Sequence, residues 1–452
     1  MTQMSVGPRW PRMRFCEAPS LESATRLDLN ERGIAHNPSR VQADGFSLGM
    51  AQLSGEPGGR GRVWGERTLP LPLRVDGARP QALARLEAVA RELTREDNWF
   101  EWQMSWDSEP RWFHTYAAAP SALSLDRVYV DSARTDTWTT TLSAPADPFA
   151  VGEPLVLGPF TVANRPSGAT YPMRVELPPV IGEVAAPAVV QLEKQAAGAM
   201  LGPAVAVVAD APDVATAASW GGGVAAAVTD GSYLAGSYRS TTGALTDWTT
   251  VATFAPSGTS RGRRRTLLRL SGSGDTGSLL LRWRISAAGV SSRVYSTPRV
   301  VQVDPQLRWV DVGEVPWPLA AGTRLPVSAA TVLTLEARRV APGGELRLDN
   351  HLIMLPVDPD SSLLQLDPDY VGTGPVTALV DAEDRVAEMT VGGAPMRAPG
   401  AAGGWPHLSP HRDNHLWVAQ ALDPTPMAGV HDDPNSTTAV TVTYRPRYLW
   451  GV

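Results

Sequence analysis

The clearest pattern of hydrophobic and polar positions is a helical repeat between Pro80 and Leu93. Its apolar residues Leu83, Leu86, Ala90 and Leu93 recur at the spacing that places side chains on one face of a helix. Proline suits the first helical turn, because its missing N–H would have no partner there. Since the helix has one apolar face, we predict that it lies on a sheet.

Two alternating stretches follow the helix and predict a pair of strands. Residues Phe100–Asp107 alternate between apolar and polar, as in a half-buried strand, and Glu101 and Gln103 fall on the polar face. After turn residues at 107–110, a second alternating stretch begins at Trp112. The helix and the two strands are therefore predicted to form one packing unit.

A third alternation, later in the chain, predicts a separate sandwich. Apolar Leu279, Leu281, Trp283 and Ile285 alternate with residues of the opposite face. Other strand-like segments lie close to it in sequence, at 266–270, 300–303, 307–312, 332–337 and 345–355. Closely spaced strands with turn residues between them are typical of a jelly roll or a similar sandwich.

Composition favours strands over helices for the chain as a whole. The 452 residues include 41 Gly and 40 Pro, and few long helical patterns occur. We therefore predict an all-β fold of several β-sandwich domains, with one short helix packed on the N-terminal sheet. At roughly 100 to 200 residues per domain, the length predicts about three domains.

The strand pattern predicts that one of these domains is inserted into another. Residues 1–152 hold the helix and the strand pair, and residues 198–356 hold the later sandwich. The flanking segments 153–197 and 357–452 contain further strand-like stretches. They are predicted to form one discontinuous middle sandwich.

Three groups of segments carry a resemblance to a known family. They are RTLPLPLRVDG with the helix and DNWFEWQMSWDSEPRWFHTYAAAP, then DTWTTTL with APADPFAVGEPL, and finally GGWPHLSPHRDNHLWVA with TTAVTVTYRPRYL. In order and spacing they resemble the distal tail and minor tail proteins of siphophages, the long-tailed bacteriophages. The resemblance implies a ring-forming domain at 1–152 and a galectin-like fold for the discontinuous sandwich.

The same resemblance implies a function and partners. Such a protein forms a ring at the tail tip, usually a hexamer, which joins the tail tube and other tail-tip proteins to the host-recognition apparatus. It is assembled in the host cytoplasm and located in the virion. The resemblance implies no catalytic residue, no cofactor and no metal.

The insert carries a resemblance of its own and the candidate binding residues. GSYLAGSYRS and LRLDNHLIMLPVD are similar to the first and last strands of carbohydrate-binding jelly rolls. Polar, Gly/Ser/Thr-rich stretches of the insert contain Trp220, Tyr233, Tyr238 and Trp248. An exposed aromatic ring can stack on a sugar, so these four residues are the candidate carbohydrate-binding set, with packing in the core or in turns as the alternative.

Charge and cysteine content argue against several classes of protein. The net charge is −6, no basic stripe dominates, and Lys194 is the single lysine among 40 basic residues, so a sequence-specific nucleic-acid binder is not predicted. Cys16 is the only cysteine, which rules out an internal disulfide. The apolar run 196–209 is interrupted and shorter than the ~20 residues of a membrane helix, and the first residues lack a signal-peptide core. Assembly inside a cell without membrane insertion is therefore expected.

Two charged clusters are predicted to be solvated. The arginine run at 261–265 lies between Ser/Gly-rich segments and predicts a loop, with contact to an anionic wall polymer or phosphate as the alternative. Where the insert rejoins its host domain lie Asp358, Asp360, Asp367 and Asp369. These carboxylates predict a linker, with calcium coordination or glycosidase-type catalysis as alternatives.

Three short motifs match known sites in letters but not in context. Gly272–Gly277 has the letters of a dinucleotide fingerprint, but a strand follows it instead of a helix, so we predict a hairpin turn. Gly45–Gly49 matches a hydrolase nucleophile elbow without the helix that should follow. His407, His411 and His415 have helical spacing, but intervening prolines predict a loop, with a metal site as the alternative.

Three functions therefore remain open. The first is a tail-tip structural subunit whose ring displays several weak sites for a host cell-surface glycan, since multivalency raises avidity without a tight pocket. The second is a polysaccharide-degrading hydrolase with β-sandwich binding modules. The third is a free-standing lectin.

Overall fold

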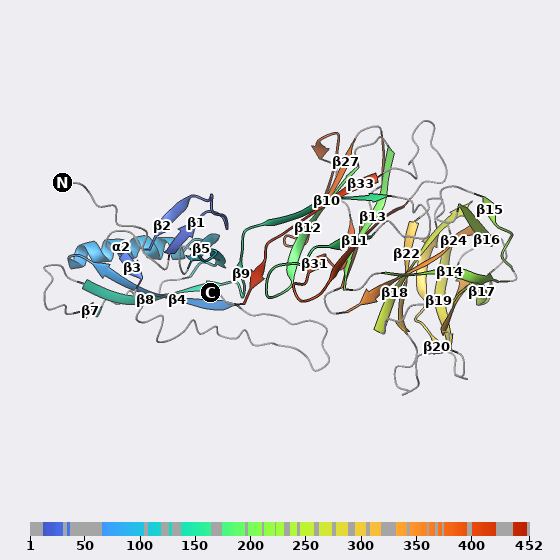
Figure 1. Cartoon of the computed structure of the whole chain (residues 1–452), viewed down its shortest axis with the longest axis horizontal. Helices are drawn as coiled ribbons and strands as arrows, with labels where there is room; N and C mark the ends of the chain where they lie inside the picture. Colours follow the sequence, from blue (N-terminus) through green and yellow to red (C-terminus); the bar gives the residue numbers. More distant parts are fainter. Residues whose placement is uncertain are drawn as a thin grey trace. The chain divides into compact units, whose positions relative to one another are not determined.

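The structure is a computed structural model, and it consists mainly of antiparallel strands (Figure 1). It describes residues 12–29, 34–36, 66–103, 107–118, 126–128, 137–163, 174–194, 198–209, 212–221, 223–229, 236–241, 245–256, 262–273, 277–287, 294–303, 308–317, 331–340, 344–358, 361–366, 369–372, 375–395, 400–421 and 437–449. Within these residues, α2 (Arg79–Leu93) is the one α-helix, and no helix has the length and apolar character to cross a membrane. The prediction of an all-β fold with one short helix is confirmed.

The chain divides into two compact units. Unit 1 consists of Met1–Leu155, Ile181–Ala186 and Arg445–Val452. Unit 2 consists of Val156–Val180 and Pro187–Tyr444. The end of the chain thus groups with its beginning, whereas the sequence pattern assigned all of 357–452 to the middle sandwich.

Unit 1 is built on one sheet with the path β2-β1-β5-β6-β8-β4-β3, to which β7, β9 and β34 are attached. The strands are β1 (Arg12–Cys16), β2 (Thr25–Asp28), β3 (Ile34–His36), β4 (Arg67–Asp76), β5 (Asn98–Gln103), β6 (Arg111–Thr115), β7 (Asp126–Val128), β8 (Thr137–Ala146), β9 (Ala150–Val151) and β34 (Arg447–Tyr448). The longest pairing joins β4 to β8 over ten residues, from Arg67↔Ala146 to Asp76↔Thr137. The helix–strand–strand unit predicted from the sequence is therefore part of a larger sheet.

Helix α2 covers one face of this sheet, as its single apolar stripe predicts (Figure 1). Ala82, Leu86, Val89 and Leu93 are buried in a core that also contains the inward residues of β1, β4, β5 and β8. Full burial of a Leu or Val side chain contributes about 1.5–3 kcal/mol. Gly77, with a φ of 125°, makes the turn from β4 into the helix, a backbone conformation that favours glycine.

Unit 2 contains two sheets made from the segments that flank the insert. One has the path β10-β33-β12-β27-β28-β29, with β31 on β12, and the other has the path β11-β32-β13-β25-β30, with β26 on β13. The strands are β10 (Leu155–Ala163), β11 (Arg174–Leu177), β12 (Ala186–Lys194), β13 (Gly198–Val208), β25 (Ser362–Leu366), β26 (Asp369–Gly372), β27 (Val376–Asp381), β28 (Val386–Val391), β29 (Ala394–Pro395), β30 (Ala401–Gly403), β31 (His407–Leu408), β32 (Asn414–Ala421) and β33 (Thr437–Tyr444). β33 alternates between buried and less buried residues, which is typical of a sandwich strand.

The insert forms the remaining strands of unit 2. They are β14 (Asp213–Trp220), β15 (Val228–Thr229), β16 (Ser237–Thr241), β17 (Thr249–Phe254), β18 (Gly262–Ser273), β19 (Gly277–Ala287), β20 (Val294–Tyr295), β21 (Arg299–Val303), β22 (Arg308–Trp317), β23 (Thr331–Arg339) and β24 (Glu345–Val357). The pairings of these strands among described residues are all with one another. The predicted alternation of β19 is present, since Leu279, Leu281, Trp283 and Ile285 are all buried in the insert's core.

The start of the insert differs from the sequence-based boundary at residue 198. Residues 198–208 form β13, which pairs with β25, β26 and β32 of the flanking sheets. The last five residues of β13, Ala204–Val208, are buried on both faces, so the strand shows no period of two that would reveal its sheet. The division into three domains otherwise stays a prediction.

The Gly272–Gly277 motif is not the hairpin turn that we predicted. Gly272 belongs to β18, which pairs with β22 and β24, whereas Gly277 begins β19, which pairs with β20, β21 and β23. The motif therefore connects two strands that do not pair with each other. The Gly45–Gly49 motif lies outside the described residues.

Candidate functional site

The predicted carbohydrate-binding residues occupy separate environments in the insert. Trp220 ends β14 and packs partly against the core, Tyr238 lies in β16, and Trp248 lies just before β17. Tyr233 is outside the described residues. The three described side chains are all partly buried, and sugar binding by this set stays a prediction.

An arginine lies over each of these three rings. The guanidinium carbon is 5.3 Å from the ring centroid for Arg239 and Trp220, 5.1 Å for Arg347 and Tyr238, and 4.0 Å for Arg282 and Trp248. These distances are those of cation–π contacts. At least one face of each ring is therefore in contact with a guanidinium group.

The densest of these contacts surrounds Trp248, the residue just before β17. The guanidinium carbon of Arg282 lies 4.0 Å from the ring centroid of Trp248 and 4.3 Å from that of Tyr295. Arg338 contributes a second guanidinium 5.2 Å from the Trp248 centroid. We call Trp248, Arg282, Arg284, Tyr295, Glu336 and Arg338 the arginine–aromatic face.

Strand alternation places this face on the outside of the sheet. Leu281 and Trp283 point into the core, so Arg282 and Arg284 of β19 point outward. Glu336 of β23 lies opposite Arg282 in the ladder and accepts hydrogen bonds from its Nε and Nη2 at 2.9 and 2.7 Å. Its other oxygen is 3.3 Å from Nε of Arg284. Two guanidinium groups thus share the carboxylate of Glu336, and Arg338 adds a third positive charge to the face, which therefore carries a net positive charge.

The arginine run at 261–265 is not the solvated loop that we predicted. Residues 262–265 begin β18, and Arg264 is buried with its Nε 3.3 Å from Asp213. Arg263 pairs with Glu314 and Arg265 with Asp311. The carboxylates come from strands that are distant in sequence, so the run itself contains no sign of the pairing.

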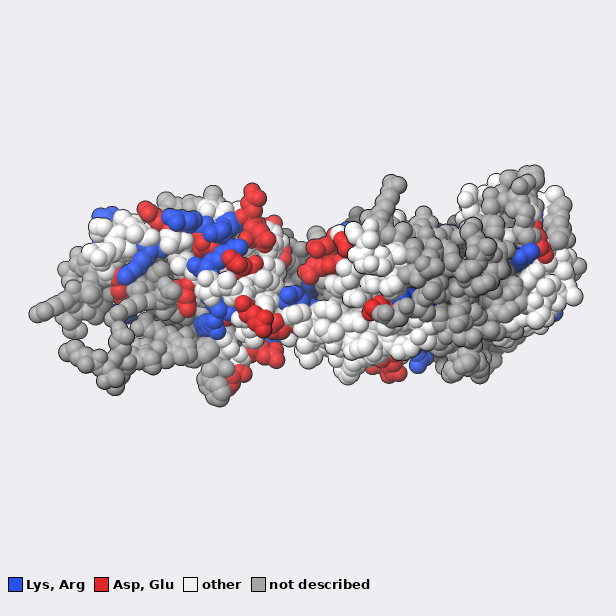
Figure 2. All heavy atoms as spheres, turned by 90° about the horizontal axis from the view of Figure 1, so that it is seen from above, with Lys and Arg blue, Asp and Glu red and all other residues white. Residues whose placement is uncertain are grey.

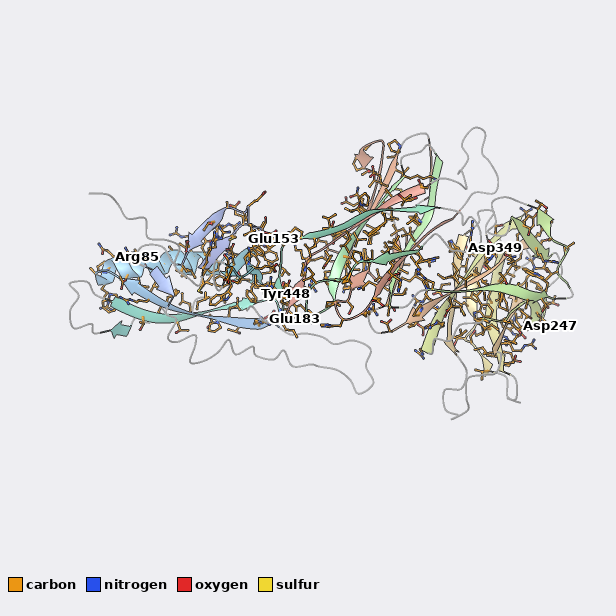
Figure 3. All side chains as sticks on the ribbon, viewed as in Figure 1. Arg85, Glu153, Glu183, Asp247, Asp349 and Tyr448 are labelled. Atoms are coloured by element: carbon orange, nitrogen blue, oxygen red, sulfur yellow. The ribbon has the colours of Figure 1, made fainter. Side chains whose placement is uncertain are left out.

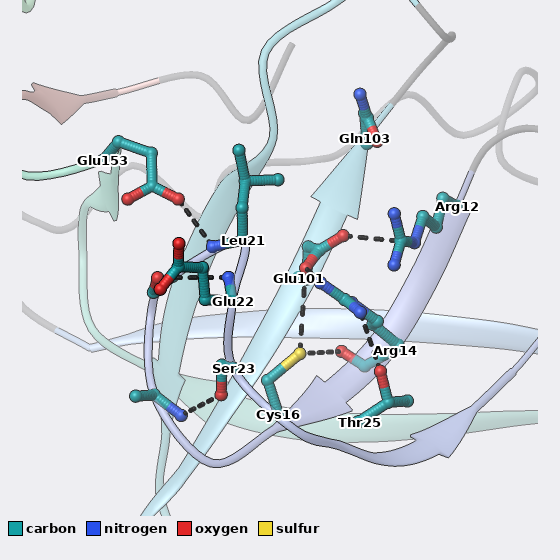
Figure 4. Close-up of polar contacts among 12 residues, drawn as sticks. Arg12, Arg14, Cys16, Leu21, Glu22, Ser23, Thr25, Glu101, Gln103 and Glu153 are labelled. Atoms are coloured by element: carbon teal, nitrogen blue, oxygen red, sulfur yellow. Dashed lines mark hydrogen bonds and ion pairs between the residues drawn. The ribbon is translucent and has the colours of Figure 1, made fainter.

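A second polar cluster lies on the face of the N-terminal sheet opposite helix α2 (Figure 4). Arg14 of β1 donates from Nε to Oε2 of Glu101 in β5 at 2.6 Å and from Nη1 to Thr25 at 2.7 Å. Nε of Arg12 is 3.4 Å from the other carboxylate oxygen. Glu101 is fully buried and Gln103 nearly so, which corrects their assignment to the polar face of a half-buried strand.

Cys16 belongs to the same cluster and is buried. Its thiol donates to Glu101 at 3.7 Å. Burial raises the pKa of the Cys16 thiol to about 12, and the neighbouring Glu101 adds to the increase while Arg14 opposes it. A thiol in this state is a poor nucleophile at neutral pH.

His114 connects two carboxylates at the edge of the same face. Its Nε2 is 3.1 Å from Asp97 and its Nδ1 is 3.4 Å from Asp147. The Trp99 ring lies 4.9 Å from the imidazole, centroid to centroid. The Tyr116 hydroxyl donates to Asp147, and burial, followed by this hydrogen bond, raises the pKa of Tyr116 to about 12.

The predicted loop of histidines and the aspartate cluster show ordinary polar contacts. Nδ1 of His407 is 2.9 Å from the carbonyl oxygen of Trp405, and His415 is buried in β32. Asp358 accepts a hydrogen bond from Ser361 at 2.6 Å and pairs with Arg412. Asp360 and Asp367 lie outside the described residues. Across the described part of the chain, no group of three or more His, Cys, Asp or Glu side chains is arranged to hold a metal ion.

The exposed charges of unit 1 are mixed in sign. In the view of Figure 2, basic and acidic side chains alternate over this unit. Surface pairs such as Arg74 with Asp76 and Arg111 with Glu109 contribute to this mixture. The described residues on this face of unit 1 therefore show no continuous basic stripe of the kind that a nucleic-acid backbone attracts.

Comparison with known proteins gave distant structural similarity. No protein-family model matches the chain, and no curated protein matches it. Among solved structures, it is similar to the Dit protein of phage SPP1, described as a paradigm of the hub adsorption apparatus in Gram-positive infecting phages. The match has a TM-score of 0.34 and 10% identity and covers 97% of this chain and 99% of that chain. A similarity at this level assigns neither a fold nor a function.

Proposed function

We propose that this chain is a structural component of a bacteriophage tail tip. The proposal starts from the three groups of segments that resemble distal tail and minor tail proteins. The observation that carries it furthest is that RPRYL, the end of the last group, belongs to the same folded unit as the first two groups, although the rest of the last group lies in unit 2. Segments that carry a common function are expected to fold together.

The contacts between these segments are specific. β34 pairs with β9, and Gly152 donates its N–H to the carbonyl of Pro446 at 2.9 Å. Arg67 of β4 donates to the carbonyl of Leu449 at 2.6 Å. Figure 3 shows Tyr448 beside Glu183, which accepts the N–H of Leu449 at 2.7 Å. The sequence RPRYL thus completes the sheet that the first segments begin.

In the proposed assembly, unit 1 forms a homo-oligomeric ring, most simply a hexamer, on the tail tube. The ring would join the tube to other tail-tip proteins, and the insert would project host-binding surfaces. A cell-surface glycan bound weakly by each copy would be held through several copies together. The protein would act in the virion after assembly in the host cytoplasm, without catalytic chemistry.

The oligomeric state tests the proposal directly. We expect light scattering of the purified protein to give a mass near six times the 48.3 kDa subunit, and negative-stain images to show rings. A chain truncated after Tyr444 lacks β34 and should lose the ring. If the purified protein is monomeric, adding the tail-tube protein tests whether ring assembly requires this partner. A monomer in every one of these conditions, or turnover of a polysaccharide by the pure protein, would contradict the proposal.

A further inference from the structure

We propose that the arginine–aromatic face of the insert binds a linear polymer that carries one phosphate group in each repeat, and not a neutral sugar chain. The inference rests on the proposed host-binding role of the insert and names the class of ligand.

The aromatic rings of this face are already engaged by guanidinium groups. Arg282 lies between Trp248 and Tyr295, at 4.0 and 4.3 Å from the two centroids. These contacts and the hydrogen bonds of its Nε and Nη2 to Glu336 restrain the guanidinium of Arg282. Trp248 and Tyr295 therefore position a cation, while a neutral sugar would have to displace it.

The charges of the face are incompletely neutralised. Both oxygens of Glu336 are occupied, one by Arg282 and the other by Arg284. Among the described residues, no carboxylate pairs with Arg338. An incoming anion would therefore meet N–H donors of Arg338 and the remaining donors of the other two arginines.

The geometry of the sheet favours a repeating phosphate. Arg282 and Arg284 point the same way from β19, which spaces their Cα atoms by roughly 7 Å. The two non-bridging oxygens of a phosphate within a polymer chain can each accept from a different guanidinium group, and arginine is well suited to phosphate recognition. An extended polymer could therefore contact successive arginines along the strand.

Exposed apolar groups beside the arginines suit the uncharged part of such a polymer. Tyr295 is 45% exposed and Val300 of the neighbouring β21 is 67% exposed. Val300 lies opposite Leu280 in the ladder, on the same outer face as Arg282. The face thus combines anion-binding groups with an apolar margin.

Binding to inorganic polyphosphate of defined length, measured by titration calorimetry with the full-length protein, tests the inference. Dextran serves as the neutral polymer and polygalacturonate as the carboxylate polymer at equal charge concentration. We expect binding of polyphosphate, weaker binding of polygalacturonate and none of dextran. Because the Arg284→Gln/Arg338→Gln double variant removes two charged groups that would donate to phosphate, it should bind polyphosphate at least about 10-fold more weakly.

Two further variants separate the site from general charge effects. Arg239→Gln removes an arginine that stacks on Trp220 outside this face, and it should bind like the unaltered protein. Trp248→Leu should also weaken polyphosphate binding, because Arg282 loses its support. Thermal unfolding of each variant confirms that the insert is folded.

Three results would overturn the inference. They are dextran binding as tight as polyphosphate binding, equal affinity for the two anionic polymers, and equal losses in the double variant and in Arg239→Gln. Light scattering of the same samples reports the proposed assembly independently. A protein that forms rings but fails to bind polyphosphate would lose only this inference.

Discussion

Arg14 donates through Nε to the carboxylate of Glu101 at 2.6 Å, and both side chains are buried in the N-terminal sheet. The two residues are direct partners in the β1–β5 ladder, so the sheet itself sets their distance. Breaking a buried ion pair by removing one charge leaves the other without compensation in a medium of low polarity. The pair is therefore a sensitive probe of unit 1.

We expect Glu101→Gln to destabilise unit 1 by about 3–5 kcal/mol, because Arg14 keeps its buried charge. Hydrogen exchange of the amides in β1 and β5 measures this loss separately from unit 2. Asp76→Asn, which breaks the exposed pair with Arg74 in the same sheet, is the control and should cost less than about 1 kcal/mol. Equal losses of stability from the two substitutions would show that the buried Arg14–Glu101 pair contributes no more to the stability of unit 1 than the exposed pair does.

The Cys16 thiol should react slowly while unit 1 is folded. With its pKa raised from 9.0 to about 12, mainly by burial, the folded thiol has roughly 1,000-fold less thiolate at pH 8 than an unfolded one. Iodoacetamide should therefore label the protein rapidly in denaturant and very slowly without it. Similar labelling rates in the two conditions would refute the burial of this thiol.

The raised pKa of the Cys16 thiol also predicts a loss of stability at alkaline pH. Below pH 9 the thiol is protonated in both states, so its contribution to folding is fully present. Between pH 9 and about 12 the unfolded chain loses this proton while the folded chain retains it, so stability falls as the pH rises. Cys16→Ser should reduce this part of the pH dependence in urea unfolding of unit 1. If Cys16→Ser left the fall in the free energy of unfolding between pH 9 and about 12 unchanged, the prediction would be wrong.

Gly403 and its neighbour Gly404 offer a matched pair of substitutions in unit 2. Gly403 has a φ of 122°, and an added Cβ would lie 2.1 Å from the carbonyl oxygen of Leu363. At Gly404 the nearest atom to an added Cβ is 3.7 Å away. We expect Gly403→Ala to cost at least about 2 kcal/mol and Gly404→Ala much less, measured by urea unfolding. Equal costs would show that the backbone at Gly403 relaxes freely.

Trp283 of β19 and Thr266 of β18 are joined by one buried hydrogen bond. The indole N–H donates to the Thr266 hydroxyl at 2.8 Å, and that hydroxyl donates to the carbonyl of Gly313 at 2.7 Å. Thr266→Val should cost about 1–3 kcal/mol, because it leaves buried polar groups without partners. When Thr266→Val is made in a protein that already carries Trp283→Phe, it should cost less stability, because the indole donor is already absent. Strict additivity in a double-mutant cycle would contradict this coupling.

Local patterns predicted the elements of this fold well. The helix and the alternation of Leu279, Leu281, Trp283 and Ile285 are present as expected, because period and side-chain type report directly on burial within one element. The same reasoning could not show that the second face of β5 is also covered. The buried charge of Glu101 is compensated by Arg14, which lies 87 residues away in the sequence.

The candidate site was predictable only in part. Trp248 stood out as an aromatic residue in a polar stretch, but its partners Arg282, Tyr295 and Arg338 come from three other strands or strand ends. Nothing in the sequence around Trp248 indicates that a guanidinium covers its ring. The pairing of arginines 263–265 with carboxylates of other segments was hidden for the same reason.

The pairing of β34 with β9 also sets an order of events during synthesis of the chain. The first 155 residues leave the ribosome long before Arg447 and Tyr448, yet their sheet lacks β34 until these residues arrive. Unit 2, whose last residue is Tyr444, can be complete first. A chain that ends after Tyr444 would thus contain every residue of unit 2 but lack the last strand of the unit 1 sheet.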